Sequence, residues 1–310
     1  MTIALAAYGP NAGKAVTLGL QAAEILGRGA IGGFAVVSVL DARDQHRQVC
    51  CQSGGIAALA DLTEFHAAHC AAAISSGSNR PEPLSQFLVG RAGVGLVTGH
   101  RLPNRRERRD QPVNLAVLEL MAQGQSPSAA VEVTLATNAE LDVGLIAVGP
   151  RGPLGFGNTS RVMRRNDVLT ASREAGGIGY AMLCNSIFSA RDIWLEDVVG
   201  AIMWSHLCAE TSPYVIADMH APVPVYPDNE DRVELDADHR LTAVRTAEPN
   251  ITRPAARTTL VHAGAPVWQG GECIGRAASE IFASVAEGQA RTLSEHPAQF
   301  LIERCRDVAA

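Results

Sequence analysis

A mostly apolar segment opens the chain. Between residues 2 and 8, only Thr2 and Tyr8 at its two ends carry polar groups. Such a run predicts a strand that is buried on both faces. The turn residues Gly9-Pro10-Asn11 follow. Apolar residues then lie along one stripe from Ala12 to Leu26, which predicts a helix that ends at Gly27. The β-branched stretch from Ile31 to Leu40 predicts a central strand, paired with a strand over residues 49–52 that ends at Gly54-Gly55.

The pattern further along the chain predicts both helices and strands. A helix-rich stretch is expected around His66, His69 and Cys70, followed by a Ser/Gly/Pro-rich linker over residues 75–83. The predicted strands cover residues 91–98, 141–148 and 179–185, and the predicted helices cover residues 113–122, 128–135, 194–208, 276–290 and 293–306. Strand–strand and helix–helix neighbours outnumber strict alternation of the two, which favours an α+β fold. We expect a single domain over residues 1–310, with the Pro-, Asp-, Glu- and Arg-rich residues 220–256 forming surface excursions.

Composition narrows the functional classes. The net charge of −6 argues against general nucleic-acid binding, and the one basic cluster, over residues 101–109, is interrupted by Glu107. No apolar run reaches the ~18 residues of a membrane span. The seven cysteines lack C-x-x-C spacing, which is typical of thiols in a reducing compartment, and no charged segment precedes the first apolar run. These features predict a cytoplasmic protein that binds neither nucleic acid nor membrane.

The middle of the chain carries the most specific motif. A glycine-flanked strand over residues 93–97 leads to Asn104, a helix with a Gly- and Ser-rich end over residues 118–130, and a strand over residues 142–148. This succession, together with the start Met1-Thr2, resembles a bacterial family called domain of unknown function 1028. That family in turn resembles the N-terminal nucleophile (Ntn) hydrolases. The resemblance implies a four-layer αββα sandwich of two antiparallel sheets between helix layers, here with a C-terminal elaboration, and a small-molecule or peptide-like amide substrate.

Thr2 is the candidate catalytic residue. Removal of Met1 would leave Thr2 with a free α-amine, so that its hydroxyl can attack a substrate while its own amine accepts the proton. The resemblance implies that Thr2 then lies at the end of a central strand, facing the cleft between the sheets. A retained Met1 would block this amine and make Thr2 a structural residue. Thr98 and Thr159 are the alternatives, as nucleophiles released by self-cleavage.

Acyl transfer also needs hydrogen-bond donors for the oxyanion and groups that hold the substrate. Candidates for these roles, by residue type, are Gly54, Gly55, Asn104, Asn158, Thr159, Arg161, His100 and Arg101. Asn158, Thr159 and Arg161 belong to a Gly-rich polar segment over residues 155–161, which suits an anionic ligand and equally suits a plain loop. His100 and Arg101 can supply a titratable group and an anion anchor, or form a solvated loop.

Three functions therefore remain open. The first is an Ntn-hydrolase-like amidohydrolase acting by acyl transfer; the second is a non-catalytic binder of a small anionic metabolite in the cleft; the third is an unrelated structural α+β oligomer. The segment over residues 9–15 resembles a phosphate loop but has one spacer too few and lacks the Ser/Thr that binds magnesium. We expect no cofactor and no metal ion, a small-molecule substrate or ligand, and a homo-oligomer.

Overall fold

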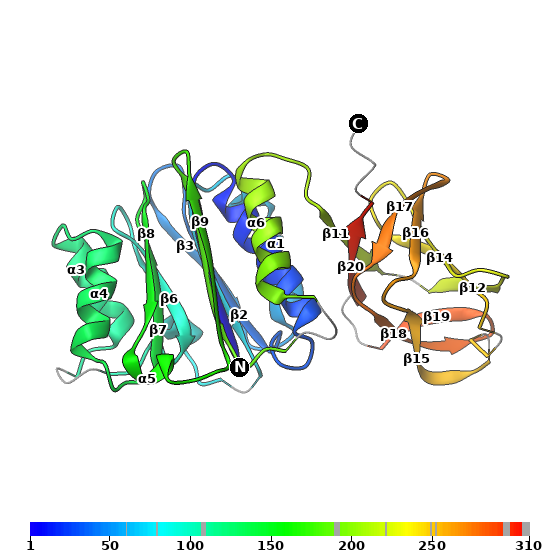
Figure 1. Ribbon diagram of the computed structural model, residues 1–310, viewed down its shortest axis with the longest axis horizontal. Helices are drawn as coiled ribbons and strands as arrows, with labels where there is room; N and C mark the ends of the chain where they lie inside the picture. Colours follow the sequence, from blue (N-terminus) through cyan, green and yellow to red (C-terminus); the bar gives the residue numbers. More distant parts are fainter. Residues whose placement is uncertain are drawn as a thin grey trace. The chain divides into compact units, whose positions relative to one another are not determined.

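The computed structural model describes residues 1–59, 61–78, 80–106, 110–188, 193–220, 222–248, 250–251, 253–293 and 298–305. The fold is α+β, as predicted, with several sheets and few helices (Figure 1). The chain divides into two compact units, unit 1 over residues 1–211 and unit 2 over residues 212–310. This division differs from the single domain expected for residues 1–310. Its physical reason is that the strands after residue 212 bond to one another and enclose an apolar core of their own.

Unit 1 contains an antiparallel six-stranded sheet in the order β3-β2-β4-β1-β10-β9. Its strands are β1 (Thr2–Tyr8), β2 (Phe34–Leu40), β3 (His46–Cys51), β4 (Cys70–Ser76), β9 (Val168–Ala175) and β10 (Ile178–Asn185). All seven residues of β1 are buried, which explains why its sequence is a continuous apolar run. Strand β4 replaces most of the helix-rich stretch expected around Cys70, because its residues fill the place between β1 and β2.

Helices α1 (Ala12–Leu26) and α6 (Leu195–Leu207) cover one face of this sheet (Figure 1). Ile3 and Leu5 of β1 belong to the apolar cluster on that side, which also contains Val16 and Val199 of the two helices. The short helices η1 (Gly55–Ala58) and α2 (Thr63–His66) lie between β3 and β4 in the chain.

The other face of the six-stranded sheet packs on an antiparallel four-stranded sheet in the order β5-β6-β7-β8. Its strands are β5 (Val89–Arg91), β6 (Gly95–Arg101), β7 (Val143–Val148) and β8 (Leu154–Asn158). Ala4 and Ala6 of β1 meet Leu96 and Ile146 in the apolar cluster between the sheets. Helices α3 (Val113–Ala122) and α4 (Pro127–Thr137) pack on the outer side of this second sheet (Figure 1). Helices η2 (Leu84–Phe87) and α5 (Ser160–Met163) complete unit 1.

Unit 2 is a β-structure of ten strands in the order β11-β20-β17-β16-β13-β14-β12-β19-β18-β15. The strands are β11 (Tyr214–Met219), β12 (Val223–Pro227), β13 (Arg232–Leu235), β14 (Leu241–Thr246), β15 (Ala255–Val261), β16 (Pro266–Gln269), β17 (Glu272–Ala277), β18 (Ile281–Ala286), β19 (Gln289–Thr292) and β20 (Ala298–Arg304).

Two expectations for unit 2 were therefore wrong. Residues 220–256 are not surface excursions, because Val225, Val233 and Val244 of β12, β13 and β14 lie in the apolar core. In place of the helices expected over residues 276–290 and 293–306, the described residues form the end of β17, the strands β18, β19 and β20, and the connections between them. In β18, Ile281, Ala283 and Val285 are buried at every second position, as a half-buried strand requires.

None of the helices in the described part of the chain combines the length and the apolar character needed to cross a membrane.

Candidate functional site

A polar cluster lies between the two sheets of unit 1, at the end of the six-stranded sheet where β1 begins. Thr2 lies opposite Ser76 of β4 and Asn185 of β10 in the strand register. Side chains of a strand alternate between its faces. Ala4 and Ala6 point toward the four-stranded sheet, so Thr2 points the same way. The side chains of Ser76 and Asn185 share this face, and all three residues are buried.

The four-stranded sheet contributes His100 of β6 and Asn158 of β8. His100 is fully buried, and its Nδ1 lies 3.3 Å from Asn185 Oδ1 while its Nε2 lies 2.6 Å from Asn158 Oδ1. Burial lowers the pKa of His100, although the bonds to the two asparagines act in the opposite direction. A depressed pKa favours the neutral imidazole at pH 7, whose single N–H can donate to only one of the two asparagine oxygens. The other ring nitrogen accepts a hydrogen bond only where the facing asparagine presents its amide nitrogen.

Gly144 of β7 provides the space for this histidine. It lies opposite both His100 and Asn158 in the strand register. A Cβ at this position would lie 2.2 Å from Asn158 Oδ1 and 2.2 Å from His100 Nε2. Only glycine therefore lets the His100–Asn158 pair lie against the backbone of β7.

Among the described residues, Ser76 is the side-chain hydrogen-bond partner of the Thr2 hydroxyl. Thr2 Oγ1 lies 3.3 Å from Ser76 Oγ. Ser76 Oγ donates to the carbonyl oxygen of Met1 at 2.5 Å and accepts from Arg80 Nη2 at 2.7 Å. Since the guanidinium can only donate, the proton of Ser76 is directed at the Met1 carbonyl, which belongs to the peptide bond that precedes Thr2.

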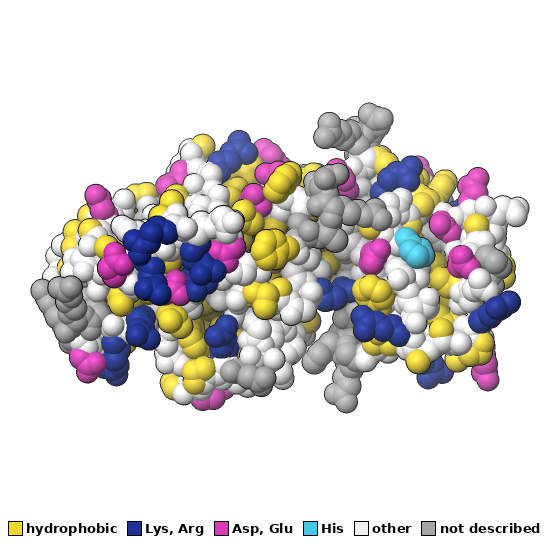
Figure 2. Space-filling model, turned by 60° about the horizontal axis from the view of Figure 1, so that its bottom comes forward, with side chains coloured by type: hydrophobic (Ala, Val, Ile, Leu, Met, Phe, Trp, Pro, Cys, Tyr) yellow, Lys and Arg dark blue, Asp and Glu magenta, His cyan; other side chains and the backbone are white. Residues whose placement is uncertain are grey.

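The charged groups around the chain start are mostly arginines. Burial, followed by the positive charges of Arg80 and Arg101, lowers the pKa of the Met1 amine, and the charge of Asp167 opposes this effect. Figure 2 turns toward the reader the lower side of Figure 1, where the N-terminus is marked, and Lys and Arg side chains with Asp and Glu side chains among them gather on the left part of this face. Lowering the pKa of an amine increases the fraction that can accept a proton at neutral pH.

Two of these arginines are neutralised by carboxylates. Arg101 pairs with Asp142 through both oxygens, with 2.6 Å between Arg101 Nε and Asp142 Oδ1. Arg165 donates two bonds of 2.7 Å to Asp167. These bonds, with a further one from Ser186, hold the pKa of Asp167 well below its usual range.

The structure brings together three of the nine residues predicted from sequence, namely Thr2, His100 and Asn158. Arg101 follows His100 at the end of β6 and acts electrostatically on the Met1 amine, so it borders the cluster. Asn104 lies in the loop beyond β6 and donates to Gln86 Oε1 at 3.1 Å, outside the cluster.

The other four predicted residues lie elsewhere. Thr159 caps α5, since its hydroxyl accepts from Val162 N and donates to Leu141 O. Arg161 is an exposed residue of the same short helix. Gly54 and Gly55 lie on the helix-covered side of the six-stranded sheet, because a Cβ at Gly55 would lie 2.2 Å from Glu24 Oε2 of α1. These two glycines are therefore not placed to serve an oxyanion beside the Thr2 hydroxyl.

The structure adds four residues to the cluster that the sequence pattern did not reveal. They are Ser76, Arg80, Gly144 and Asn185. Ser76 and Asn185 each end an apolar run, at the last residue of β4 and of β10. A polar residue that closes a buried strand is a signal that could have pointed to this sheet edge. Arg80 and Gly144 carry no comparable signal, because their roles depend on the three-dimensional arrangement.

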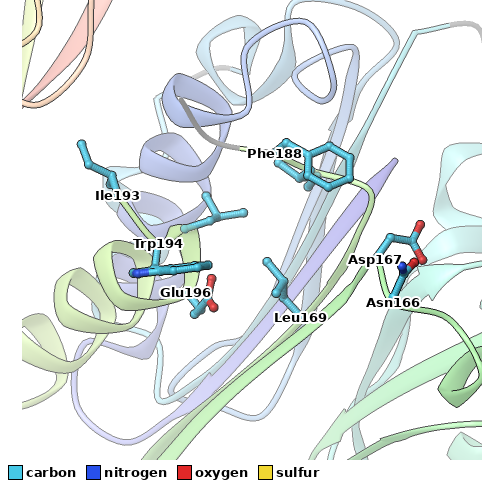
Figure 3. A pocket seen from close by; sticks show the side chains of 9 residues that line it. Asn166, Asp167, Leu169, Phe188, Ile193, Trp194 and Glu196 are labelled. Atoms are coloured by element: carbon cyan, nitrogen blue, oxygen red, sulfur yellow. The ribbon is translucent and has the colours of Figure 1, made fainter. Parts of the chain in front are cut away.

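A cavity of about 270 Å³ is lined in part by Asp167, the residue before β9. Asp167, Leu169, Phe188, Trp194 and Glu196 are among its lining residues (Figure 3). One carboxylate oxygen of Glu196 is buried without a hydrogen-bond partner among the described residues. Leu169 and Leu195 pack with the apolar cluster under α1 and α6, so this cavity opens on the side of the sheet away from the Thr2 hydroxyl.

Comparison with known proteins gives family matches and a weak structural likeness. Residues 222–298 match a family described as Domain of unknown function (DUF7259). No curated protein matches the chain. A solved structure of glutamine phosphoribosylpyrophosphate (PRPP) amidotransferase from B. subtilis, complexed with ADP and GMP, is similar with a TM-score of 0.35 and 11% identity. The similarity covers 58% of this chain and 41% of that chain, and at this TM-score it carries no argument.

The longer of the two family matches covers unit 1. Residues 2–215 match a family described as Domain of unknown function (DUF6963), which is more than half of the chain. The resemblance of the mid-chain motifs to domain of unknown function 1028 stays a prediction. The chain belongs to the family described as Domain of unknown function (DUF6963).

Proposed function

We propose that unit 1 is an Ntn-hydrolase-like amidohydrolase with a four-layer αββα architecture, and that Thr2, once Met1 is removed, is its nucleophile. The observation that carries the proposal is the position of Thr2. Thr2 is 4% exposed at the first residue of a central strand, opposite Ser76 and Asn185, and its side chain faces the sheet that carries His100. A hydroxyl at a strand start, among buried polar groups and next to a free amine, has the parts needed for acyl transfer.

The charges at the start of β1 support the amine of Thr2 as general base. The Met1 amine is already depressed in pKa by burial and by Arg80 and Arg101. The Thr2 amine would lie one residue further along the chain, at the first residue of β1. A depressed pKa leaves more of the amine unprotonated at neutral pH, so that it can accept the proton of the Thr2 hydroxyl.

We assign the role of hydrogen-bond donor to the oxyanion to Ser76. Its hydroxyl already donates to a carbonyl oxygen, that of Met1, beside the Thr2 hydroxyl. Removal of Met1 would free this donor for a substrate carbonyl. A preorganised donor of this kind stabilises the negative charge that develops on the oxygen in the transition state.

The proposed reaction has two steps, transfer of the acyl group to Thr2 and hydrolysis of the resulting ester. Thr2 Oγ1 adds to the amide carbon while its proton passes to the Thr2 amine, and the oxygen of the carbonyl takes up the negative charge. The C–N bond then breaks, the departing amine takes the proton from the Thr2 ammonium, and an ester to Thr2 remains. Water hydrolyses this ester in the second step, with the same amine as base.

Two measurements test the proposal. The intact mass of the purified full-length protein should show loss of Met1. Hydrolysis of a panel of dipeptides, N-acyl amino acids and primary amides should fall at least 1000-fold in Thr2→Ala and be retained in part in Thr2→Ser. Thr137→Ala, which removes an exposed hydroxyl on α4, is the matched control. Full activity of protein that keeps Met1, or of Thr2→Ala, would overturn the Thr2 mechanism.

A second candidate is a non-catalytic binder of a small anionic metabolite at the same place. The positive charge of Arg80, which has no carboxylate partner among the described residues, supports it. Binding of an anion without hydrolysis of any amide in the panel would favour this second function.

A further inference from the structure

We infer that Arg80 forms a carboxylate subsite beside Thr2, and that the substrate is a small amide with a carboxylate only a few bonds from the scissile carbonyl. This inference rests on the proposed function and names the substrate class of the same site.

Arg80 is an arginine at this site whose charge has no carboxylate partner among the described residues. Arg101 and Arg165 are each held by an aspartate through two bonds. The side chain of Arg80 instead donates to the neutral Ser76 hydroxyl and has no ion pair with any described residue. A guanidinium offers five N–H donors in a planar fork that matches a carboxylate, so most of its donors remain available for a ligand.

Backbone contacts hold the chain at and before Arg80. Gln52 Nε2 donates to the carbonyl oxygen of Arg80 at 2.6 Å. The preceding loop packs against Gly33 so closely that a Cβ there would lie 1.9 Å from Ser78 N, and Gly33 N donates to Ser76 O at 2.8 Å. Arg80 is therefore held at both its side chain and its backbone, as preorganised recognition requires.

The distances limit the size of the ligand. Arg80 Nη2 lies 2.7 Å from Ser76 Oγ, which lies 3.3 Å from Thr2 Oγ1. The guanidinium is thus within about 6 Å of the nucleophile, and attack requires the scissile carbon to be about 3–3.5 Å from it. A carboxylate held by Arg80 can be separated from that carbon by about three bonds, as in an N-acyl α-amino acid or the half-amide of a short diacid.

Ser76 connects the two functions of the subsite. It accepts from Arg80 and directs its own proton at a carbonyl oxygen, so a substrate bound through its carboxylate would present its amide carbonyl to Ser76 and to Thr2 together. An uncharged amide would lack the anchor. The selectivity therefore depends on charge rather than on the shape of an apolar pocket.

The test measures binding in the Thr2→Ala variant, which lacks the proposed nucleophile. In Thr2→Ala, calorimetry with N-acetylglycine and with succinamic acid distinguishes a carboxylate on the departing amine from one on the acyl group, and N-acetylglycine methylamide serves as the uncharged probe. We expect at least one acid to bind at least 10-fold more tightly than the methylamide. Adding Arg80→Gln should weaken that acid about 10- to 100-fold and leave the methylamide unchanged, the size expected for a charge-assisted pair.

Two variants control for damage to the fold. Arg91→Gln removes an exposed arginine that pairs with Glu119 and should leave binding unchanged. Arg80→Lys keeps the charge but loses the fork, so it should restore part of the affinity. Thermal unfolding checks that each variant folds.

The outcomes separate the two proposals. Equal binding of acid and methylamide, or equal binding with and without Arg80, overturns the carboxylate subsite even if Thr2 proves catalytic. Arg80-dependent binding of an acid that is never hydrolysed supports the subsite and contradicts the proposed hydrolase.

Discussion

Replacing Gly144 by alanine should break the hydrogen-bonded pair of His100 and Asn158, which lie on the strands at either side of β7 in the four-stranded sheet. The new Cβ would lie 2.2 Å from both His100 Nε2 and Asn158 Oδ1, which forces the hydrogen-bonded pair apart. Leaving these polar atoms buried without their bond costs about 1–3 kcal/mol. Inserting a methyl group into packed space costs about 1–3 kcal/mol more. Alanine returns about 0.5–1 kcal/mol of backbone entropy, so we expect a net loss of about 3 kcal/mol.

Gly157→Ala is the matched control, on the neighbouring strand β8. Its Cβ would approach only Leu135 Cδ1, at 3.1 Å, and we expect a change below about 1 kcal/mol. Urea unfolding of the full chain, followed by tryptophan fluorescence in a Trp268→Phe background, reports on unit 1 because the other two tryptophans, Trp194 and Trp204, both lie there. Equal unfolding free energies for the two glycine variants would refute the reasoning.

Three further predictions concern buried groups of unit 1. Burial raises the pKa of Glu24 from 4.5 to about 7. As the pH rises between these values, Glu24 ionises more readily in the unfolded chain, so the folded chain should lose stability relative to Glu24→Gln. A difference in unfolding free energy between the two proteins that does not change with pH would contradict this. Thr98 Oγ1 is buried without a hydrogen-bond partner among the described residues, so Thr98→Val should be neutral or stabilising by up to about 1 kcal/mol in urea unfolding, and a clear loss would count against it. Burial raises the pKa of Cys184 to about 12 and that of Cys70 further, so a thiol reagent followed by mass mapping should label exposed Cys50 in the native protein well before either buried cysteine.

Much of unit 1 could be predicted from local pattern. Strand β1 and helices α1, α3 and α6 lie within a few residues of their predicted ranges, because a doubly buried strand and an amphipathic helix each leave a strong periodic signal. Strand β4 was missed because alanine, which fills its sequence Cys70–Ser76, favours helices in isolation. Its place between β1 and β2 outweighs this local preference.

In unit 2 the hydrophobic pattern led to the prediction of a helix where the chain forms strands. The segment Ile281–Ala286 alternates buried and partly exposed residues, but its alanines and its short length also fit a helical stripe. Gly288, with a φ of 71°, marks the turn between β18 and β19 and would have argued for a hairpin.

The candidate site was only partly accessible from the sequence. Thr2, His100 and Asn158 could be proposed from residue type, since each is polar and lies at the end of an apolar segment. Ser76 and Asn185 enter through strand register over separations of 74 and 183 residues, which no local pattern encodes. Gly54 and Gly55 were placed wrongly as oxyanion donors because sequence does not show which face of a sheet a loop covers.

The pairing of β1 with β10 also sets the order in which the chain can fold during synthesis. Thr2 pairs with Asn185, so β1, which is synthesised before the other strands of unit 1, has to wait for one of the last strands of that unit. At about 5–20 residues per second this delay is roughly 10–40 seconds. One edge of a mostly apolar strand stays open throughout that time, which exposes it to pairing with other chains. Production of this protein should therefore respond to slower translation, lower temperature or added chaperone more than its final stability alone would suggest.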